Sequence, residues 1–297
     1  MYEDYFKFNS KPFALNPDPA FLYPSPQHAA ALTMLEYAIE SQAAFCLLTG
    51  EIGSGKTTVV RQLIRLLDER FTVGLISNTH ERFQSIFPWA LSALGMSPVD
   101  GSDIALYEAL TDFVIRDYGK GRRTLLILDE AQNLPIQLLE ELRLLSNVNS
   151  EKDIALQILL VGQPELRAKL ERPELEQFAQ RVSVDFHLEC LNLAEACAYV
   201  QHRLTVAGGD PEMFRPDAVA FVHDRAHGIP RLMNQLCDLS LVYAFAEQRR
   251  VIDEQLVRQV LQERNRGRAM RVFGSDPVAV PLAQLSTADT GSASKRL

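Results

Sequence analysis

The residues with the clearest chemical potential form a glycine-rich loop at 50–57, which ends in Lys56-Thr57. An apolar stretch precedes the loop and a helix-like stretch follows it, as a phosphate-binding loop requires. Its glycines let successive N–H groups turn toward one point, and the positive end of the helix adds to them. We expect Lys56 to reach the β- and γ-phosphates of a nucleoside triphosphate and Thr57 to bind Mg²⁺. The residues expected to contact the phosphates are Gly50, Glu51, Ile52, Gly53, Ser54, Gly55, Lys56, Thr57 and Thr58.

A second acidic motif, Asp129-Glu130, directly follows the apolar run 122–128. Ligands collect at the carboxyl ends of the strands of a parallel sheet. Asp129 is therefore placed to hold the Mg²⁺ that Thr57 also touches. Glu130 is the candidate base that orients a water for in-line attack on the γ-phosphate. The structural alternative is that the pair only begins a turn into the next helix.

Gln163 ends the fourth strand-like run, 154–162. If this strand lies between the strand of the phosphate loop and the strand of Asp129, the Gln163 side chain faces the γ-phosphate and can position the attacking water. The alternative is a hydrogen bond to the local turn.

Three arginines are candidates for neutralising the charge of the transition state or for binding phosphate. Arg181 precedes a fifth strand-like run, where its guanidinium can project to a neighbouring subunit; Arg172 competes for this role. Arg231 opens a later helix, from which it can bind phosphate and couple the nucleotide to the angle between domains. For each of them the structural alternative is a surface ion pair.

Strand-like and helix-like runs alternate through the first 190 residues. This alternation predicts a parallel α/β sheet with helices on both faces. The expected strands are 43–49, 72–77, 122–128, 154–162 and 181–188, and the expected helices are 27–39, 58–67, 83–94, 104–118 and 135–145. Before them, residues 1–27 are rich in proline and aromatic residues, which predicts an ordered irregular arm because proline blocks helices.

The pattern changes near Leu191, after which no strand-like run appears. We expect a small all-helical second domain with helices at 192–207, 216–226, 230–248 and 253–264. The expected organisation is an arm at 1–27, an α/β domain at 28–190, a helical domain at 191–265, and a basic segment with a tail at 266–297. The last part, 274–297, lacks aromatic residues and is expected to be disordered.

Bulk properties narrow the class of protein. The chain has 297 residues, 47% of them hydrophobic, and a formal charge of −8. Its apolar runs are too short for a membrane span, and its start lacks the features of a secretory signal. Four scattered cysteines favour reduced thiols in the cytoplasm. The acidic balance disfavours sequence-independent binding of nucleic acid but leaves room for a local basic patch.

The order of these motifs resembles that of AAA+ ATPases, and more narrowly the ExeA/GspA family of bacterial secretion and envelope-assembly ATPases. The resemblance covers residues 1–265. Its more specific segments are Met1-Tyr2-Glu3-Asp4-Tyr5-Phe6, Pro12-Phe13, Asn16-Pro17-Asp18-Pro19, Asp129-Glu130-Ala131-Gln132-Asn133-Leu134 and Gly162-Gln163-Pro164-Glu165-Leu166.

The resemblance implies a P-loop NTPase (AAA+) domain, in three layers, followed by a helical lid. It implies ATP and Mg²⁺ as ligands, with a nucleotide-dependent homo-oligomer that forms a ring or a filament. Gln163 would be the first sensor, Arg181 the finger supplied to a neighbour, and Arg231 the second sensor. Adenine would lie between the arm and the lid, where His28 either touches the base or packs at the start of its helix.

The resemblance also suggests a location and a partner. Longer family members continue into a membrane span and a peptidoglycan-binding domain, whereas this sequence ends where that span would begin. We therefore expect a soluble ATPase module without a transmembrane segment. It would be cytoplasmic, with peripheral contact to the inner membrane as an option, and would act on an envelope or secretion protein.

Rival functions remain open from the sequence. One rival is an ATP-gated DNA-binding adaptor of the kind that regulates transposition. Another is contact of the same basic segment with anionic membrane, and a third is a switch that binds nucleotide with little hydrolysis. The first two depend on a basic cluster that otherwise fits helix ends and a solvated tail: Arg249, Arg250, Arg264, Arg266, Arg268 and Arg271.

Overall fold

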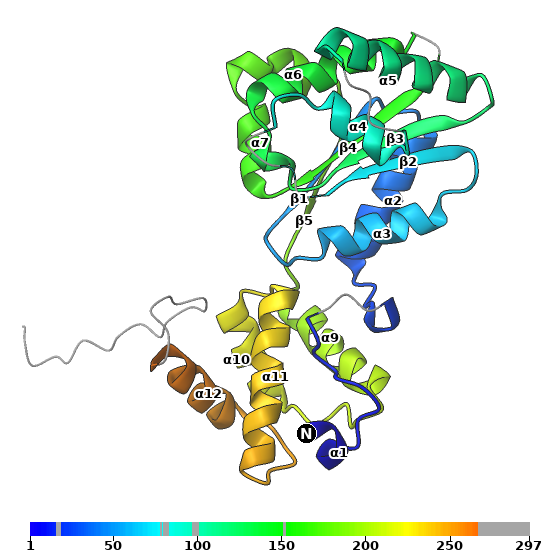
Figure 1. The fold of residues 1–297 in the computed structure, drawn as a ribbon. Helices are drawn as coiled ribbons and strands as arrows, with labels where there is room; N and C mark the ends of the chain where they lie inside the picture. Colours follow the sequence, from blue (N-terminus) through cyan, green and yellow to red (C-terminus); the bar gives the residue numbers. More distant parts are fainter. Residues whose placement is uncertain (16–18, 78, 80–82, 97–100, 151–152, 267–297) are drawn as a thin grey trace, which may run out of the picture.

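The computed structural model describes residues 1–266, except 16–18, 78, 80–82, 97–100 and 151–152. These residues form two bodies, an α/β domain and a helical domain (Figure 1). The chain crosses between the two bodies twice, once on the way from the amino-terminal arm into helix α2 (Pro26–Glu40) and once from strand β5 (Val182–Leu188) into helix α9 (Leu193–Val206).

The α/β domain is built on a parallel sheet with the strand order β2-β3-β4-β1-β5. Strand β4 therefore lies between β3 and β1, which is the order that the expectation for Gln163 requires. The inner strands are buried along almost their whole length, as helices on both faces of a parallel sheet demand. Besides β5, the strands are β1 (Phe45–Gly50), β2 (Phe71–Ile76), β3 (Arg123–Leu128) and β4 (Leu156–Gly162).

Helices cover both faces of this sheet, which gives the three layers expected from the sequence. Adjacent residues of β1 point to opposite faces: Leu47 packs in one hydrophobic cluster and Leu48 in the other. The cluster around Leu48 includes α2 and α3 (Lys56–Leu66). The cluster around Leu47 includes the helices α4 (Phe87–Ala93), α5 (Asp103–Tyr118), α6 (Ile136–Leu145), α7 (Pro164–Leu170) and α8 (Glu176–Ala179).

Some local elements of this domain and of the arm differ from the expectation. The helix expected at 83–94 begins only at Phe87, because Pro88 is tolerated only in the first turn of a helix. Helix α7 was missed, although Pro164 in its first turn and Leu166 and Leu170 on one buried face mark it. The short turns of 3-10 helix at η1 (Pro19–Phe21), η2 (Ala131–Asn133), η3 (Ser146–Val148) and η4 (Pro173–Leu175) were also not expected.

The second domain is helical in its described part, as expected. Asn192 caps α9 through a reciprocal pair of hydrogen bonds with Glu195. The domain's other helices are α10 (Pro216–Ala226), α11 (Pro230–Ala246) and α12 (Glu254–Arg266). The tail expected at 274–297 lies outside the described residues.

The amino-terminal arm packs with the helical domain. The whole arm was expected to be irregular. Instead, Tyr2–Phe6 forms helix α1, because the first proline comes only at Pro12. The arm's buried aromatic side chains belong to the same hydrophobic cluster as those of α9 to α12: Tyr2, Phe6, Phe8, Phe13 and Phe21. The arm therefore completes the core of the helical domain before the chain enters α2.

All four cysteines are free thiols, in line with the expectation of reduced cysteine. None of the helices in the described part of the chain has the length and apolar character needed to cross a membrane.

We expect Phe13→Ala to lower the free energy of unfolding of the helical domain by about 3–5 kcal/mol, the usual cost of emptying a buried aromatic site. Phe13 is 1% exposed, and its ring meets Phe214 edge-on at 5.7 Å. Urea unfolding followed by circular dichroism measures the change. Ile104→Ala, at a side chain that is 71% exposed, is the control and should cost under about 0.5 kcal/mol. A loss below about 1 kcal/mol for Phe13→Ala would show that the arm is not part of this core.

Candidate functional site

The phosphate-binding loop joins β1 to α3 through backbone that only glycine adopts easily. Gly53 has a φ of +85° and Gly55 a φ of +111°, both in the left-handed region. A Cβ on Gly55 would lie 2.3 Å from His28 Nε2, and one on Gly53 would lie 2.5 Å from Arg231 Cβ. The glycines thus allow the turn, and they also let α2 and the helical domain approach the loop closely.

Helix α3 begins at Lys56 without a side-chain cap, because its N-cap residue is Gly55. The first N–H groups of a helix lack partners within the helix and carry its positive dipole end. Here they lie at the end of the loop, which suits an anion such as a phosphate group.

The Lys56 side chain is folded into the loop and is only 7% exposed. Its ammonium group donates hydrogen bonds to Gly50 O at 2.7 Å and to Glu51 O at 2.9 Å. Burial lowers the pKa of Lys56, and the nearby Glu130 and Asp129 carboxylates oppose that effect. In the loop, the Lys56 ammonium group therefore contacts neutral carbonyl oxygens in place of water.

Thr57 and Asp129 lie side by side although 72 residues separate them in the chain: Thr57 Oγ1 donates to Asp129 Oδ2 at 3.3 Å. Burial, with help from the charge of Glu130, raises the pKa of Asp129, while the hydrogen bonds from Glu130 N and Thr57 oppose this. A hydroxyl and a carboxylate are oxygen ligands of the kind that Mg²⁺ takes in nucleotide sites. The donor set therefore fits Mg²⁺, whose charge would offset that of the half-buried Asp129 carboxylate.

Glu130 follows directly, with a φ of +56° that few residues other than glycine adopt. Its turn is anchored by Thr79, whose hydroxyl donates to Asp129 O at 3.1 Å and to Glu130 O at 2.6 Å. Sequence reasoning missed Thr79. Its signal was a hydroxyl residue shortly after β2, the strand next to β3.

Gln163 is brought to Glu130 by the strand order. Its Nε2 donates to Glu130 Oε2 at 3.2 Å, and its side chain makes no cap bond to α7, which begins at the next residue. The structure thus places the side chain at the acidic pair and gives no support to the local-turn alternative. Gln132 also donates to Glu130, at 2.6 Å, although the sequence motif around it suggested no role for it.

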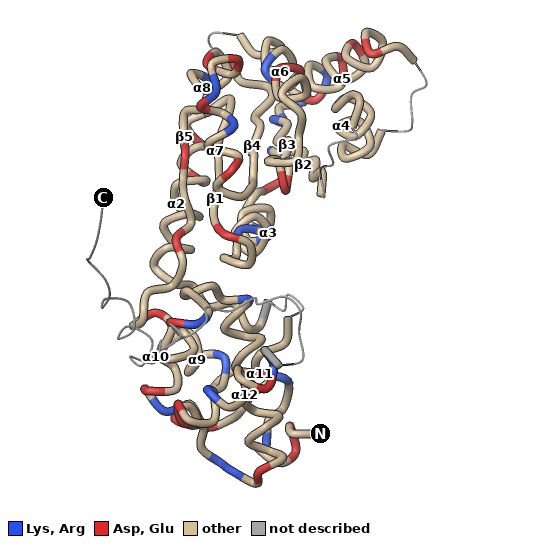
Figure 2. The backbone as a smooth tube through the Cα atoms, turned by 90° about the vertical axis from the view of Figure 1, so that its left-hand side faces the viewer, with Lys and Arg blue, Asp and Glu red and all other residues tan. Residues whose placement is uncertain are grey.

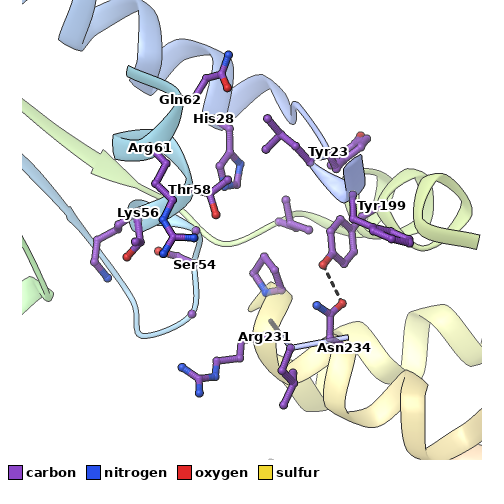
Figure 3. Close-up of a pocket in the computed structure, with 18 of the residues that line it drawn as sticks. Tyr23, His28, Ser54, Lys56, Thr58, Arg61, Gln62, Tyr199, Arg231 and Asn234 are labelled. Carbon is purple, nitrogen blue, oxygen red and sulfur yellow. Dashed lines mark hydrogen bonds between the residues drawn. The ribbon is translucent and has the colours of Figure 1, made fainter. Parts of the chain in front are cut away.

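Arg231 lies where the helical domain touches the phosphate loop. Its backbone N–H donates to Gly53 O at 3.3 Å, and its side chain extends from the start of α11 toward the side of the loop on which Lys56 lies (Figure 3). Gly228, three residues earlier, holds the second crossing between the domains, since its C=O accepts from Leu191 N at 3.0 Å. The segment 228–231 therefore fixes both the loop and the crossing.

Arg181 and Arg172 do not line this cavity. Arg181 Nη1 donates to Arg143 O at 3.1 Å, Ser146 Oγ at 2.6 Å and Asn147 Oδ1 at 3.0 Å, all at the end of α6 and in η3. Arg172 is exposed and lies directly before η4 in the chain. A contribution of either arginine to a neighbouring subunit stays a prediction.

A cavity of about 530 Å³ opens between the phosphate loop, the arm and the helical domain (Figure 3). Its phosphate end contains Lys56, Thr57 and Glu130. Aromatic and apolar side chains also line the cavity, as a site for a flat base requires: Phe21, Leu22, Tyr23, Ile52, Leu191 and Tyr199.

His28 packs at the start of its helix, and its contact with the base stays a prediction. Its Nδ1 lies 2.7 Å from Ser25 Oγ, which also caps the start of α2 by accepting from His28 N at 3.3 Å. Its ring also lines the cavity. Burial lowers the pKa of His28 against an opposing hydrogen bond to the Ser54 backbone, so a neutral imidazole faces the cavity near neutral pH.

Arg203 fastens the arm to the helical domain at the cavity wall. It is 8% exposed, and it donates to Pro12 O at 2.5 Å, Ala14 O at 3.3 Å and Tyr199 Oη at 3.1 Å. Tyr199 in turn donates to Asn234 Oδ1 at 2.7 Å. Sequence analysis missed this network, for which a charged residue within the largely apolar α9 was the available signal.

The comparisons with known proteins agree with this geometry. A family model described as an AAA domain matches residues 39–170. The chain is also 37% identical, over 247 residues, to General secretion pathway protein A of Aeromonas hydrophila, which covers 83% of this chain. The chain belongs to the ExeA/GspA family of AAA+ proteins. It spans 45% of the length of that relative.

Solved structures show the same AAA+ fold at low sequence identity. The ORC2 protein of Aeropyrum pernix superposes with a TM-score of 0.62 at 18% identity, over 86% of this chain and 72% of that chain. Cdc6p of Pyrobaculum aerophilum gives 0.61 at 18% identity, over 84% and 71%. At such identity the likeness establishes the P-loop α/β fold and its helical extension in this ExeA/GspA family member.

The basic residues expected near the carboxyl end are partly engaged within the chain. Arg249 pairs with Asp253 at 2.5 Å, and Arg250 donates to Tyr5 O and lies 3.9 Å from the centroid of the Tyr5 ring. Arg268 and Arg271 lie outside the described residues, as does the side chain of Arg266. Along the described backbone, basic residues are interspersed with acidic ones in both domains (Figure 2).

We expect Arg203→Met to weaken the binding of a fluorescent ATP analogue by about tenfold or more, because the arm loses the bonds that pre-organise the cavity wall. Arg250→Met is the matched control, since Arg250 also fastens the arm to the helical domain but lies away from the cavity. Both variants should lose thermal stability, and only Arg203→Met should lose affinity at a temperature where both are folded. Equal affinities for the two variants would show that Arg203 does not shape the site.

Proposed function

We propose that this chain binds Mg²⁺-ATP in the cavity and hydrolyses it, and that hydrolysis drives or times the assembly of a bacterial secretion or cell-envelope complex. The observation that carries the proposal is the convergence of four side chains at the carboxyl edge of β1, β3 and β4. Thr57 meets Asp129 there, and Gln163 meets Glu130.

In this proposal each region of the cavity binds one part of the nucleotide. The base lies between the arm and the helical domain, near Tyr23 and Tyr199. The triphosphate follows the loop, where Lys56 exchanges its carbonyl partners for phosphate oxygens. Thr57 and Asp129 would hold Mg²⁺, which would supply positive charge against that of the triphosphate.

Hydrolysis then needs positioning more than covalent chemistry. Glu130 accepts a proton from a water that attacks the γ-phosphorus in line with the bond to the β-phosphate oxygen. That bond breaks, ADP leaves with the bonding electron pair, and inorganic phosphate is released. Gln163 holds Glu130 and the water in place, and Arg231 binds phosphate from the side of the helical domain. The contact between Arg231 and Gly53 links the nucleotide to the angle between the two domains.

The biological role is proposed from the family. The curated relative is named General secretion pathway protein A, which supports a secretion or envelope protein as the partner of this chain. Exopolysaccharide, pilus and protein-sorting systems are the candidate settings. We propose a cytoplasmic location at or near the inner membrane and a nucleotide-dependent homo-oligomer. The DNA-adaptor alternative is less favoured, because Arg249 and Arg250 are engaged within the chain.

Phosphate release by the purified chain in Mg²⁺-ATP tests the proposal. We expect Lys56→Ala to abolish nucleotide binding, because the loop loses its buried cation. Glu130→Gln should keep ATP affinity within about twofold while turnover falls by about a hundredfold or more, because the base is lost. Isothermal titration separates binding from turnover. No affinity of the wild-type chain for Mg²⁺-ATP would refute the proposal, and retained turnover in Glu130→Gln would refute the assignment of the base.

A mixing experiment tests the role of Arg181 between subunits. Arg181→Ala and Lys56→Ala chains should each be inactive alone, and their mixture should regain part of the activity. In a mixed interface, one intact nucleotide site meets one intact Arg181. Arg172→Ala mixed with Lys56→Ala is the matched comparison for the competing arginine. An Arg181→Ala chain that is fully active alone would remove Arg181 from the mechanism.

A further inference from the structure

Gln132 bridges two elements of the proposed catalytic site. It lies in η2, the turn that follows Glu130. Its side-chain Oε1 accepts a hydrogen bond from Gln163 N at 3.1 Å, and its Nε2 donates to Glu130 Oε2 at 2.6 Å. A backbone N–H can only donate, so it fixes which end of the Gln132 amide faces β4. The NH₂ end must therefore face Glu130.

The surroundings of Gln132 hold it in this arrangement. A Cβ on Gly162 would lie 2.8 Å from Gln132 Oε1, so the glycine at the end of β4 leaves room for the amide. The turn itself is tied to α7, because Lys169 Nζ donates to Gln132 O and, at 2.8 Å, to Leu134 O.

Two amide groups converge on one oxygen of the Glu130 carboxylate. Oε2 accepts from Gln132 at 2.6 Å and from Gln163 at 3.2 Å. Among the described residues, none is found to donate a hydrogen bond to Oε1, and Glu130 lines the cavity. Because the backbone of Glu130 is itself fixed by Thr79, the two amides determine how its carboxylate is turned.

We propose that Gln132 is a positioning residue, which turns the Glu130 carboxylate so that Oε1 is presented to the attacking water. This inference rests on the proposed function, since it concerns the same hydrolysis. Gln132 acts only through Glu130 and does not contact the nucleotide. A methionine at this position would keep the volume but lose both hydrogen bonds. A glutamate could still accept from Gln163 N, but it would place a second carboxylate against Glu130.

The test compares Gln132→Met and Gln132→Glu with Gln137→Met, a control at an exposed glutamine in the following helix, α6. We expect kcat to fall about tenfold to a hundredfold in both Gln132 variants, the cost of a misplaced catalytic group. KM and the affinity for Mg²⁺-ATP should change less than twofold. The Gln137 control should match the wild type. Using two substitutions of different character guards against one that fails to fold.

A second background shows whether Gln132 acts through the carboxylate. Glu130→Asp keeps a carboxylate base, but the side chain is shorter by one methylene, which moves the carboxylate away from the Gln132 amide. Gln132→Met should therefore reduce single-turnover phosphate release less than twofold in the Glu130→Asp chain. Three outcomes would overturn the inference. Gln132→Met could reduce phosphate release equally in both backgrounds, the Gln132 variants could show an unchanged or raised kcat, or they could lose affinity in proportion to their loss of thermal stability. A wild-type chain that binds ATP but releases no phosphate would instead remove the proposed function, and this inference with it.

Discussion

The contact between Thr57 and Asp129 is the constraint on which the rest of the site depends. Thr57 lies in the first turn of α3 after β1, and Asp129 directly follows β3, with β4 between the two strands. The two side chains meet only because parallel strands bring their carboxyl ends to one edge. The same order places Gln163, at the end of β4, beside Glu130. The fold therefore brings together, from three loops that are distant in sequence, the residues proposed to hold phosphate, metal and water.

The cavity depends on a second constraint, the close approach of the helical domain to the phosphate loop. Gly53 has no side chain to keep Arg231 away, and Gly228 leaves room for Leu191 at the crossing between domains. The arm closes the remaining side because its aromatic residues are anchored in the helical core. A change in the angle between the domains would thus alter the base end and the phosphate end of the cavity together.

Sequence alone could predict the sheet, the helical domain and the phosphate loop, because each has a periodicity or spacing with a direct physical cause. It could place Gln163 only conditionally, since the strand order is set by packing across the whole sheet. Arg203 and Thr79 were missed because most of their partners are backbone carbonyl groups, which leave no pattern of residue types. The helix at Tyr2–Phe6 was missed because the prolines that follow it dominate the composition of the arm.

The site contains a positive and a negative side chain, Lys56 and Asp129, whose charged forms are both disfavoured by burial. Burial lowers the pKa of Lys56 and raises that of Asp129. The surroundings of each side chain therefore disfavour its charged form. Each effect is one that buried charges show when their hydration is only partly replaced. Phosphate oxygens would give Lys56 partners of opposite charge in place of neutral carbonyl groups, and Mg²⁺ would give Asp129 a cation. Either ligand alone would offset only one of these charges, which supports the proposal that Mg²⁺ and ATP bind this site together.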